Sequence, residues 1–272
     1  MKILSAPLLV AAILSGSMTF AQSKVPVKTG EKIHSTINTV NNITQNMMGQ
    51  EMKIVSNVTM TVQTEVKEIN PDIHLSSVVT KLLLKNEAMG QSMDFDSDKK
   101  EDMDGQIGQA VKGFIGTAND IFISTDGKPV EKKKDDGAAS AEAVLGGDIN
   151  DIAPELLLAI PASLKAGDSW TEEHNKDADN KRKIVYTIQS INGNEAVIAF
   201  TGEESTKKPK SIQGMTATIS GTNNYKGTLT VDTTSGVIKE KKTNIEGKGE
   251  TAIMSQTIPF SISAIVSTSA RQ

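Results

Sequence analysis

The sequence predicts a mainly β protein, built on long antiparallel and strongly curved sheets or a half-barrel. Three observations favour this class: apolar and polar residues alternate over long segments, helical spacing is confined to two short segments, and a similar order of elements occurs twice. Alternation with a period of two gives an antiparallel sheet one apolar face and one polar face. We therefore expect two similar β-rich halves, over 22–135 and 166–272, joined by a linker and central helix over 136–165. We expect the helices to cover the concave side of the sheet.

The first 21 residues predict export. Lys2 precedes an apolar run from Ile3 to Leu14, and a stretch of small and polar residues follows and ends at Ala21. This pattern is typical of a secretory signal peptide, because a membrane-spanning helix needs roughly 20 apolar residues. We expect cleavage near Ala21 and a periplasmic or secreted chain with no integral membrane segment.

Composition and histidine spacing argue against several classes of function. The chain has 33 acidic and 29 basic residues and a net charge of −4, so no electrostatic argument favours nucleic acid as a partner. It has no cysteine, which removes disulfides and thiolate metal sites. The three histidines, His34, His74 and His174, lie far apart and lack metal-ligand spacing. We therefore expect no catalytic residue, no metal and no cofactor, and predict that the protein is not an enzyme.

The first half contains the clearest strand of the sequence. It alternates over about fifteen residues, with one face formed by Met52, Ile54, Val58, Met60, Val62 and Val66. A turn at 70–72 leads into a returning strand with Ile73, Leu75, Val79 and Leu83 on one face. After a short strand around Phe95, apolar residues at helical spacing over 104–115 predict a short amphipathic helix. A hairpin then turns at 126–127.

The central segment and the second half repeat this plan. Apolar residues at 149, 152, 156, 157 and 160 predict a short helix over 151–160 that ends at Pro161. Gly167-Asp-Ser-Trp170 then corresponds to Gly30-Glu-Lys-Ile33, and further alternating strands follow. In the last strand we expect an inward face made of Ile258, Phe260, Ile262, Ala264 and Val266.

The candidate binding residues are the apolar side chains expected on the inner face. Methionines gather in the first half, and the chain has one tryptophan. We predict that an apolar small molecule or lipid lies against Met52, Met60, Val62, Leu75 and Trp170. The alternative for these residues is structural: methionine fills gaps in a core, and tryptophan anchors one by burying its ring. The alternative for the whole chain is a structural or envelope-assembly protein whose sheet edges pair with an envelope protein.

Three motifs carry a resemblance to a known family. They are Asp94-Phe-Asp-Ser97, Lys165-Ala-Gly-Asp-Ser-Trp170 and the segment from Tyr225 to Gly236, YKGTLTVDTTSG. In their order and spacing the chain resembles a family of exported bacterial proteins of unknown function. More distantly, its element order is similar to the half-barrel of the periplasmic carriers of lipoproteins. That second resemblance implies an apolar ligand in the concavity.

Overall fold

The computed structural model describes most of the chain after its N-terminal segment. The described residues are 24–47, 49–88, 90–128, 130, 153–175, 177–212, 215–254 and 256–272. The predicted signal peptide and most of the predicted linker lie outside them.

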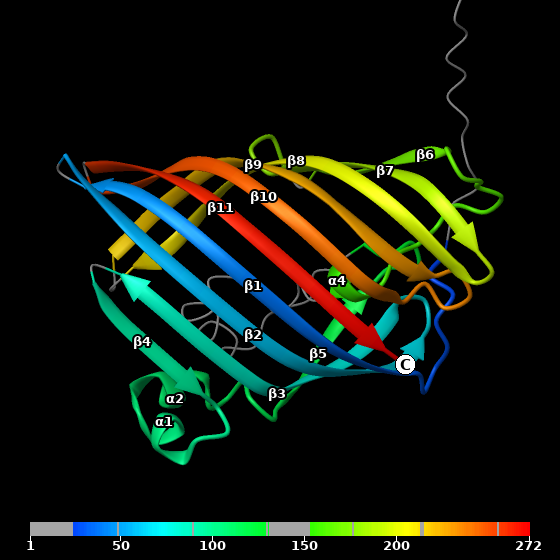
Figure 1. Ribbon diagram of the computed structural model, residues 1–272, viewed down its shortest axis with the longest axis horizontal. Helices are drawn as coiled ribbons and strands as arrows, with labels where there is room; N and C mark the ends of the chain where they lie inside the picture. Colours follow the sequence, from blue (N-terminus) through cyan, green and yellow to red (C-terminus); the bar gives the residue numbers. More distant parts are fainter. Residues whose placement is uncertain are drawn as a thin grey trace, which may run out of the picture.

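Within the described residues the chain forms one antiparallel sheet of eleven strands (Figure 1). The strands of the first half are β1 (Lys32–Met47), β2 (Gln50–Ile69), β3 (Ile73–Ala88), β4 (Gln91–Asp96) and β5 (Ala118–Ile123). Those of the second half are β6 (Ser169–Asn175), β7 (Lys181–Asn192), β8 (Glu195–Ile212), β9 (Met215–Asp232), β10 (Ile238–Ile253) and β11 (Gln256–Arg271). The predicted fold class is therefore confirmed: the protein is mainly β, with a long, curved antiparallel sheet.

The two halves share this sheet because the first strand pairs with the last. The order is β4-β3-β2-β1-β11-β10-β9-β8-β7-β6, and β5 pairs with the part of β3 that β4 leaves free. The other neighbouring pairs along this path are hairpins, whereas β1 and β11 come from opposite ends of the sequence. The sheet stays open, and it curves into a trough (Figure 1).

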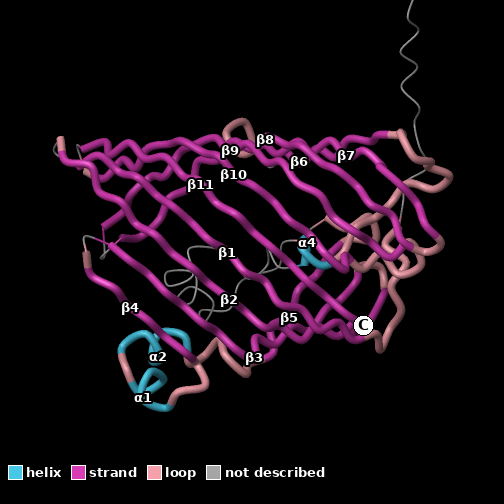
Figure 2. Tube along the Cα trace, in the orientation of Figure 1, coloured by secondary structure: helices cyan, strands magenta, loops and turns pink. Residues whose placement is uncertain are grey.

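The helices are short, and two of them follow each other directly (Figure 2). The predicted helix at 104–115 begins earlier and is split at Gly105 into α1 (Lys100–Asp104) and α2 (Gln106–Val111). The predicted helix at 151–160 is described only as α4 (Ala153–Leu156). The chain becomes extended after α4 because its backbone bonds to the sheet: Leu157 forms a bridge with Val237, and the Leu158 N–H donates to the Gly236 carbonyl at 2.9 Å.

The predicted alternation holds along β2, where Val58, Val62 and Val66 are buried and their neighbours Asn57, Gln63 and Lys67 are exposed. It fails at one predicted residue of β3. Thr80 is an extra residue in the pairing of β2 with β3, since Thr61 faces Lys81 and Val62 faces Val79. This bulge shifts the inward face by one position. As a result Leu82 and Leu84 are buried there, and Leu83 is only half-buried.

The concave face holds two large apolar clusters and one smaller one. The first cluster belongs to β1, β2, β3 and β5, and the second belongs to β6–β10. The segment after α4 joins them, because Leu157 and Ala159 pack in the first cluster while Leu158 and Leu164 pack in the second. The smaller cluster sits under α1 and α2 and includes Phe95 and Val111. The helices thus cover the concave side, as predicted.

Candidate functional site

One end of the concave face is filled by residues 153–164, which we call the α4 segment. At the other end, apolar side chains are partly uncovered. The strand registers place these side chains in adjacent cross-strand positions on the same face as the core. We call them the apolar strip: Ile43, Met52, Ile54, Ile258, Phe260 and Ile262. All six are half-buried. Ile43 lies directly between Ile54 and Ile262, whereas Gln45 lies between Met52 and Phe260, and Thr251 faces Ile258. The inward face predicted for the last strand corresponds to the β11 part of this strip.

Glycines hollow the same face between β8 and β11. Gly202, Gly221, Gly227, Gly247 and Gly249 all occupy inward positions by register. A Cβ at Gly227 would lie 2.1 Å from the Lys242 carbonyl oxygen and 2.6 Å from Phe200 Cζ. A Cβ at Gly249 would lie 2.6 Å from Phe260 Cζ. Glycine at these positions lets the strands bend sharply and lets the rings of Phe200 and Phe260 pack closely against the glycine backbone.

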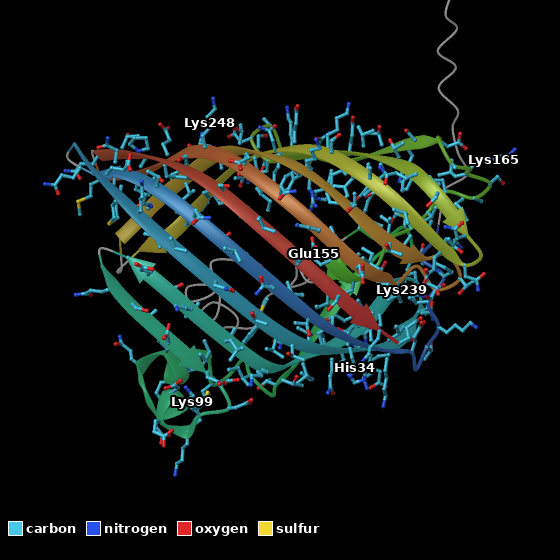
Figure 3. All side chains as sticks on the ribbon, viewed as in Figure 1. His34, Lys99, Glu155, Lys165, Lys239 and Lys248 are labelled. Atoms are coloured by element: carbon cyan, nitrogen blue, oxygen red, sulfur yellow. The ribbon has the colours of Figure 1, made fainter. Side chains whose placement is uncertain are left out.

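Charged side chains and one tyrosine of the second half and α4 also point into the concave face. We call them the polar cluster: Glu155, Glu172, Arg182, Glu204, Tyr225 and Lys241. Lys241 Nζ lies 2.7 Å from Glu155 Oε1, and these two side chains are 9% and 23% exposed. Figure 3 shows Glu155 beneath the sheet, whereas Lys248 projects from the outer face. The ion pair therefore fastens the α4 segment to the inside of β10.

The remaining contacts of the polar cluster link neighbouring strands. The Tyr225 hydroxyl donates a hydrogen bond to Glu204, and the Arg182 guanidinium lies 5.6 Å from the centre of the Tyr225 ring. Burial raises the pKa of Tyr186 and of Tyr225 well above the ordinary value, so both phenols are protonated at neutral pH. Burial also raises the pKa of the Glu172 carboxyl, which favours its neutral form.

A small cavity lies among these groups. Its volume is about 40 Å³, and Glu155, Arg182, Lys241 and Thr243 line it together with the apolar side chains Ile184, Phe200, Ile245 and Val266. Three buried polar atoms on this lining have no hydrogen-bond partner among the described residues: Glu155 Oε2, Arg182 Nε and Thr243 Oγ1. Buried polar atoms are paired in the great majority of cases. A cavity lined by several unpaired ones is therefore a candidate binding site.

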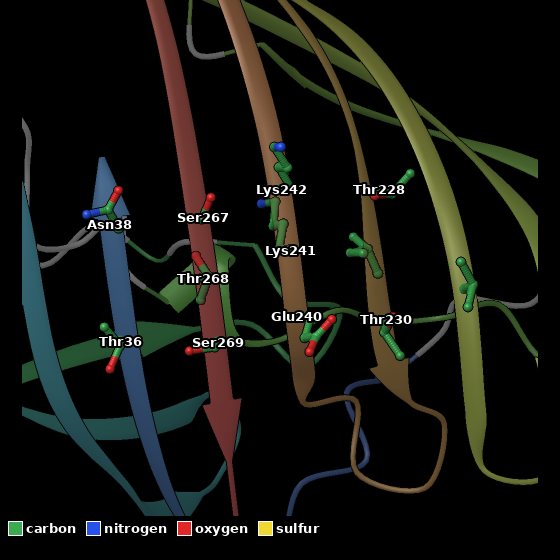
Figure 4. A pocket seen from close by; sticks show the side chains of 12 residues that line it. Thr36, Asn38, Thr228, Thr230, Glu240, Lys241, Lys242, Ser267, Thr268 and Ser269 are labelled. Carbon is green, nitrogen blue, oxygen red and sulfur yellow. The ribbon is translucent and has the colours of Figure 1, made fainter. Parts of the chain in front are cut away.

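A larger hollow, of about 360 Å³, lies on the opposite face of the sheet. Figure 4 shows its lining from β1, β11, β10 and β9, with Thr36, Asn38, Ser267 and Thr230 among the labelled side chains. These residues alternate with the buried ones along each strand, so the hollow belongs to the polar outer face. Such a depression presents hydroxyl groups that water can solvate, and we place the candidate site on the concave face.

The structure brings three of the five predicted binding residues together. Met60, Val62 and Leu75 meet in the first apolar cluster, and Val62 and Leu75 are completely buried there. Met52 lies on the same face of β2, eight residues from Met60 and about 27 Å along the strand. Trp170 lies in the second cluster, stacked on Tyr186 at 4.9 Å. The structure thus gives Val62, Leu75 and Trp170 packing roles, and Met52 alone is part of the apolar strip.

The sequence reasoning missed the polar cluster, although a signal was present. Arg182 is in phase with Ile184, Tyr186 and Ile188, and Glu204 is in phase with Ile198 and Phe200. A charged residue in phase with an apolar face is expected to point inward. The register that joins Arg182 to Glu204, and Lys241 to Glu155, depends on contacts distant in the sequence.

Comparisons with known proteins give a family match over part of the chain. A model for a family of unknown function (DUF6263) matches residues 155–238, from α4 to the start of β10. No curated protein matches the chain significantly. Among the described residues, no helix is long and apolar enough to cross a membrane, and no group of three or more His, Asp or Glu side chains is placed to hold a metal ion.

The fold is similar to part of a lipid-associated protein. A solved structure of lipovitellin, described as concerning lipid–protein interactions, matches with a TM-score of 0.53 and 12% identity over 90% of this chain. The chain spans 25% of lipovitellin, so the likeness concerns one portion of that protein and shows the fold alone. An outer membrane channel from Pseudomonas putida F1 matches with a TM-score of 0.22 and 7% identity over 92% of this chain and 98% of the channel. A TM-score this low does not indicate a shared fold.

Proposed function

We propose that this protein is a non-enzymatic binding module that holds an apolar or amphiphilic ligand, such as a lipid, on its concave face. The proposal rests on one observation: an apolar surface and a polar cavity follow each other on the concave face. The half-buried apolar strip runs along the open end of the trough, and the cavity with unpaired polar atoms lies where the trough meets the α4 segment. An apolar surface that ends in a few convergent polar groups fits a molecule with a tail and a head.

The fold likeness supports this proposal without carrying it. Lipovitellin is described by its interactions with lipid, and the part of it that resembles this chain has the same fold. The predicted signal peptide supports a periplasmic or secreted location, where a carrier or receptor of amphiphiles would meet them in water. The similar turns at Gly30 and Gly167 support an internal duplication: both have positive φ, and both donate their N–H to the second strand after the turn, at Val66 of β2 and Ile188 of β7.

The non-enzymatic assignment rests on how the inward-facing titratable groups are engaged. Glu155 pairs with Lys241, and Glu204 accepts a hydrogen bond from Tyr225. A general base or nucleophile needs a free lone pair beside a substrate and a second group that activates it. In the polar cluster Glu155 and Glu204 are each engaged by a cation or a phenol. The oxygen of Glu155 that has no partner among the described residues suits recognition of a ligand hydroxyl.

The second candidate is an envelope-assembly protein that pairs through its sheet edges. Within the described part of the chain, β6 has no strand on its outer side, and neither do β4 and β5. Both edges are short, and β6 carries Glu172, Glu173 and His174 in a row. Short, charged edges are typical of proteins that avoid edge pairing. The binding module is therefore the function we favour.

Two substitutions on one strand test the binding surface. Ile262→Ser changes the apolar strip, and Ile265→Ser, at a side chain that is 41% exposed on the outer face, is the matched control. Covering one isoleucine is worth about 1.5–3 kcal/mol, so Ile262→Ser should weaken retention of a fluorescent fatty-acid analogue by roughly 10- to 100-fold. Ile265→Ser should leave retention unchanged. Equal retention by both variants, in folded protein, would exclude the apolar strip as the binding surface.

A further inference from the structure

The cavity beside Glu155 offers both hydrogen-bond donors and acceptors that the described part of the chain does not use. Arg182 Nε can only donate, Glu155 Oε2 accepts, and Thr243 Oγ1 can do either. All three residues line the cavity, and each of the three atoms is buried. A hydroxyl group can accept from Arg182 and donate to Glu155 at the same time, whereas a group that only accepts would leave Glu155 unpaired.

The size of the cavity limits what can enter it. A water-sized group needs about 10–15 Å³ of such space, so a cavity of about 40 Å³ accommodates about three groups of that size. Two neighbouring hydroxyl groups at the end of a head group fit this space, with the rest of the molecule outside it. A sugar ring is larger than the cavity.

The charges around the cavity balance. Lys241 is paired with Glu155, and Arg182 faces Glu204 across the β7–β8 pair. Glu172 is also close to Arg182, and burial shifts it toward its neutral form. Among the described residues, each cation on the lining therefore has a carboxylate that pairs with it or faces it across the strands. An ionic head group would compete with these carboxylates for a counter-charge, and burying an unneutralised ion is costly.

The path of the tail follows from what surrounds the cavity. Leu158, Leu164 and Trp170 fill the trough on the α4 side as part of the second apolar cluster. On the other side Ile245 and Val266 line the cavity, and the inward positions beyond them on β11 are Ala264, Ile262 and Phe260. An alkyl chain that starts at the cavity can therefore run along the apolar strip toward the open end of the trough.

We infer that the cavity bounded by Glu155, Arg182 and Thr243 seats the uncharged, hydroxyl-bearing head group of an acyl amphiphile, of the monoacylglycerol class, whose tail lies on the apolar strip. This inference rests on the proposed function. It adds the chemical class of the ligand and its orientation in the trough.

Thr243→Val is the most direct variant, and the chain offers a close control. Valine keeps the shape of threonine and removes the hydroxyl group. Thr268 is also buried on the concave face with an unpaired Oγ1, but it does not line this cavity, so Thr268→Val is the matched control. Both variants should fold, because each removes a buried hydroxyl that has no partner in the free protein.

The experiment measures the affinity of the full chain for three probes that share a sixteen-carbon tail: a monoacylglycerol, a fatty acid and an alkylammonium. At pH 8, below the aggregation concentration of each probe, the uncharged probe should bind at least about tenfold more tightly than either ion. Thr243→Val should weaken monoacylglycerol binding about five- to tenfold, and Thr268→Val should leave it unchanged.

Two results separate this inference from the function on which it rests. If the ions bind as tightly as the monoacylglycerol, or if both valine variants behave alike, the head group lies elsewhere and the inference is wrong while the binding function stands. If no probe binds to the folded wild-type chain, both the inference and the binding function are wrong.

Discussion

The two halves of the trough use the same strand pattern to build different inner faces. In the first half the inward side chains are mostly aliphatic, and Ile33, Val62, Leu75 and Val79 are completely buried. The buried hydroxyl groups there include those of Thr64 and Ser77, which bond to each other. In the second half aromatic and charged side chains stand among inward glycines, and a cavity remains. A face of branched aliphatic residues packs without gaps, whereas large rings beside bare backbone leave space. The comparison indicates that the first half mainly stabilises the fold. Under the proposed function, the second half supplies the polar groups that recognise the ligand.

The largest effect should come from the aliphatic half. Leu75→Ala removes a completely buried side chain from the first cluster, and we expect a loss of about 2–5 kcal/mol in the free energy of unfolding. Urea denaturation followed by circular dichroism measures it. Val55→Ala, at a side chain that is 40% exposed on the outer face, should cost less than about 1 kcal/mol. Similar losses in both variants would contradict the division of roles.

The ion pair that fastens α4 to β10 should give the next largest effect. Lys241→Met leaves Glu155 without its partner, which we expect to cost about 2–4 kcal/mol, because removing one member of a buried pair is strongly destabilising. Adding Glu155→Gln to that variant should recover part of the loss. Thermal unfolding of the two single variants and the double variant measures the coupling, and strictly additive losses would show that the pair does not fasten the segment.

The inward glycines should give an intermediate effect confined to the second half. A methyl group at Gly227 would collide with the Lys242 carbonyl and the Phe200 ring, so Gly227→Ala should cost about 1–3 kcal/mol. Gly113→Ala is the control, since a Cβ there meets no atom within 4 Å. If both glycines tolerate alanine equally well in thermal unfolding, close packing over bare backbone does not shape the second half.

The smallest effect concerns the pH dependence of stability. Burial raises the pKa of Glu172 in the folded state, so the folded chain holds this proton more tightly than the unfolded chain does. The contribution to stability is fully present below the unfolded pKa of Glu172 and is lost as the pH rises through its folded pKa. Glu172→Gln should therefore stabilise the protein relative to wild type at pH 8 more than at pH 4. Urea denaturation of this variant and the wild type at the two pH values measures the difference, and an equal effect at both would contradict it.

Much of the sheet could be predicted from the sequence, because alternation is a local property. The period-two pattern identified β2 and the inward face of β11, and turn residues identified the hairpin at 70–72. The pairing of β1 with β11 could not be predicted, since it joins the two ends of the chain. The bulge at Thr80 and the extended backbone after Leu156 also depend on distant partners, namely β2 and the turn before β10.

The candidate site was less predictable than the fold. Val62 and Leu75 of the first half alternate clearly with polar residues because they form a core, and a core and a binding surface give the same alternation in a sequence. The arrangement of the polar cluster depends on contacts between distant segments. Strand register brings Arg182 beside Glu204, and an ion pair brings Glu155 to Lys241. Sequence phase alone shows that Arg182 points inward, but only the assembled sheet shows the cavity it borders.

The most direct test of the central claim is a native mass spectrum of the mature protein, purified without detergent from the cells that make it, followed by denaturation of the same sample. The proposed function predicts a mass above that of the polypeptide, and release of an acyl amphiphile when the protein unfolds. A mass equal to that of the polypeptide alone, from folded protein that also fails to take up an added monoacylglycerol, would contradict it.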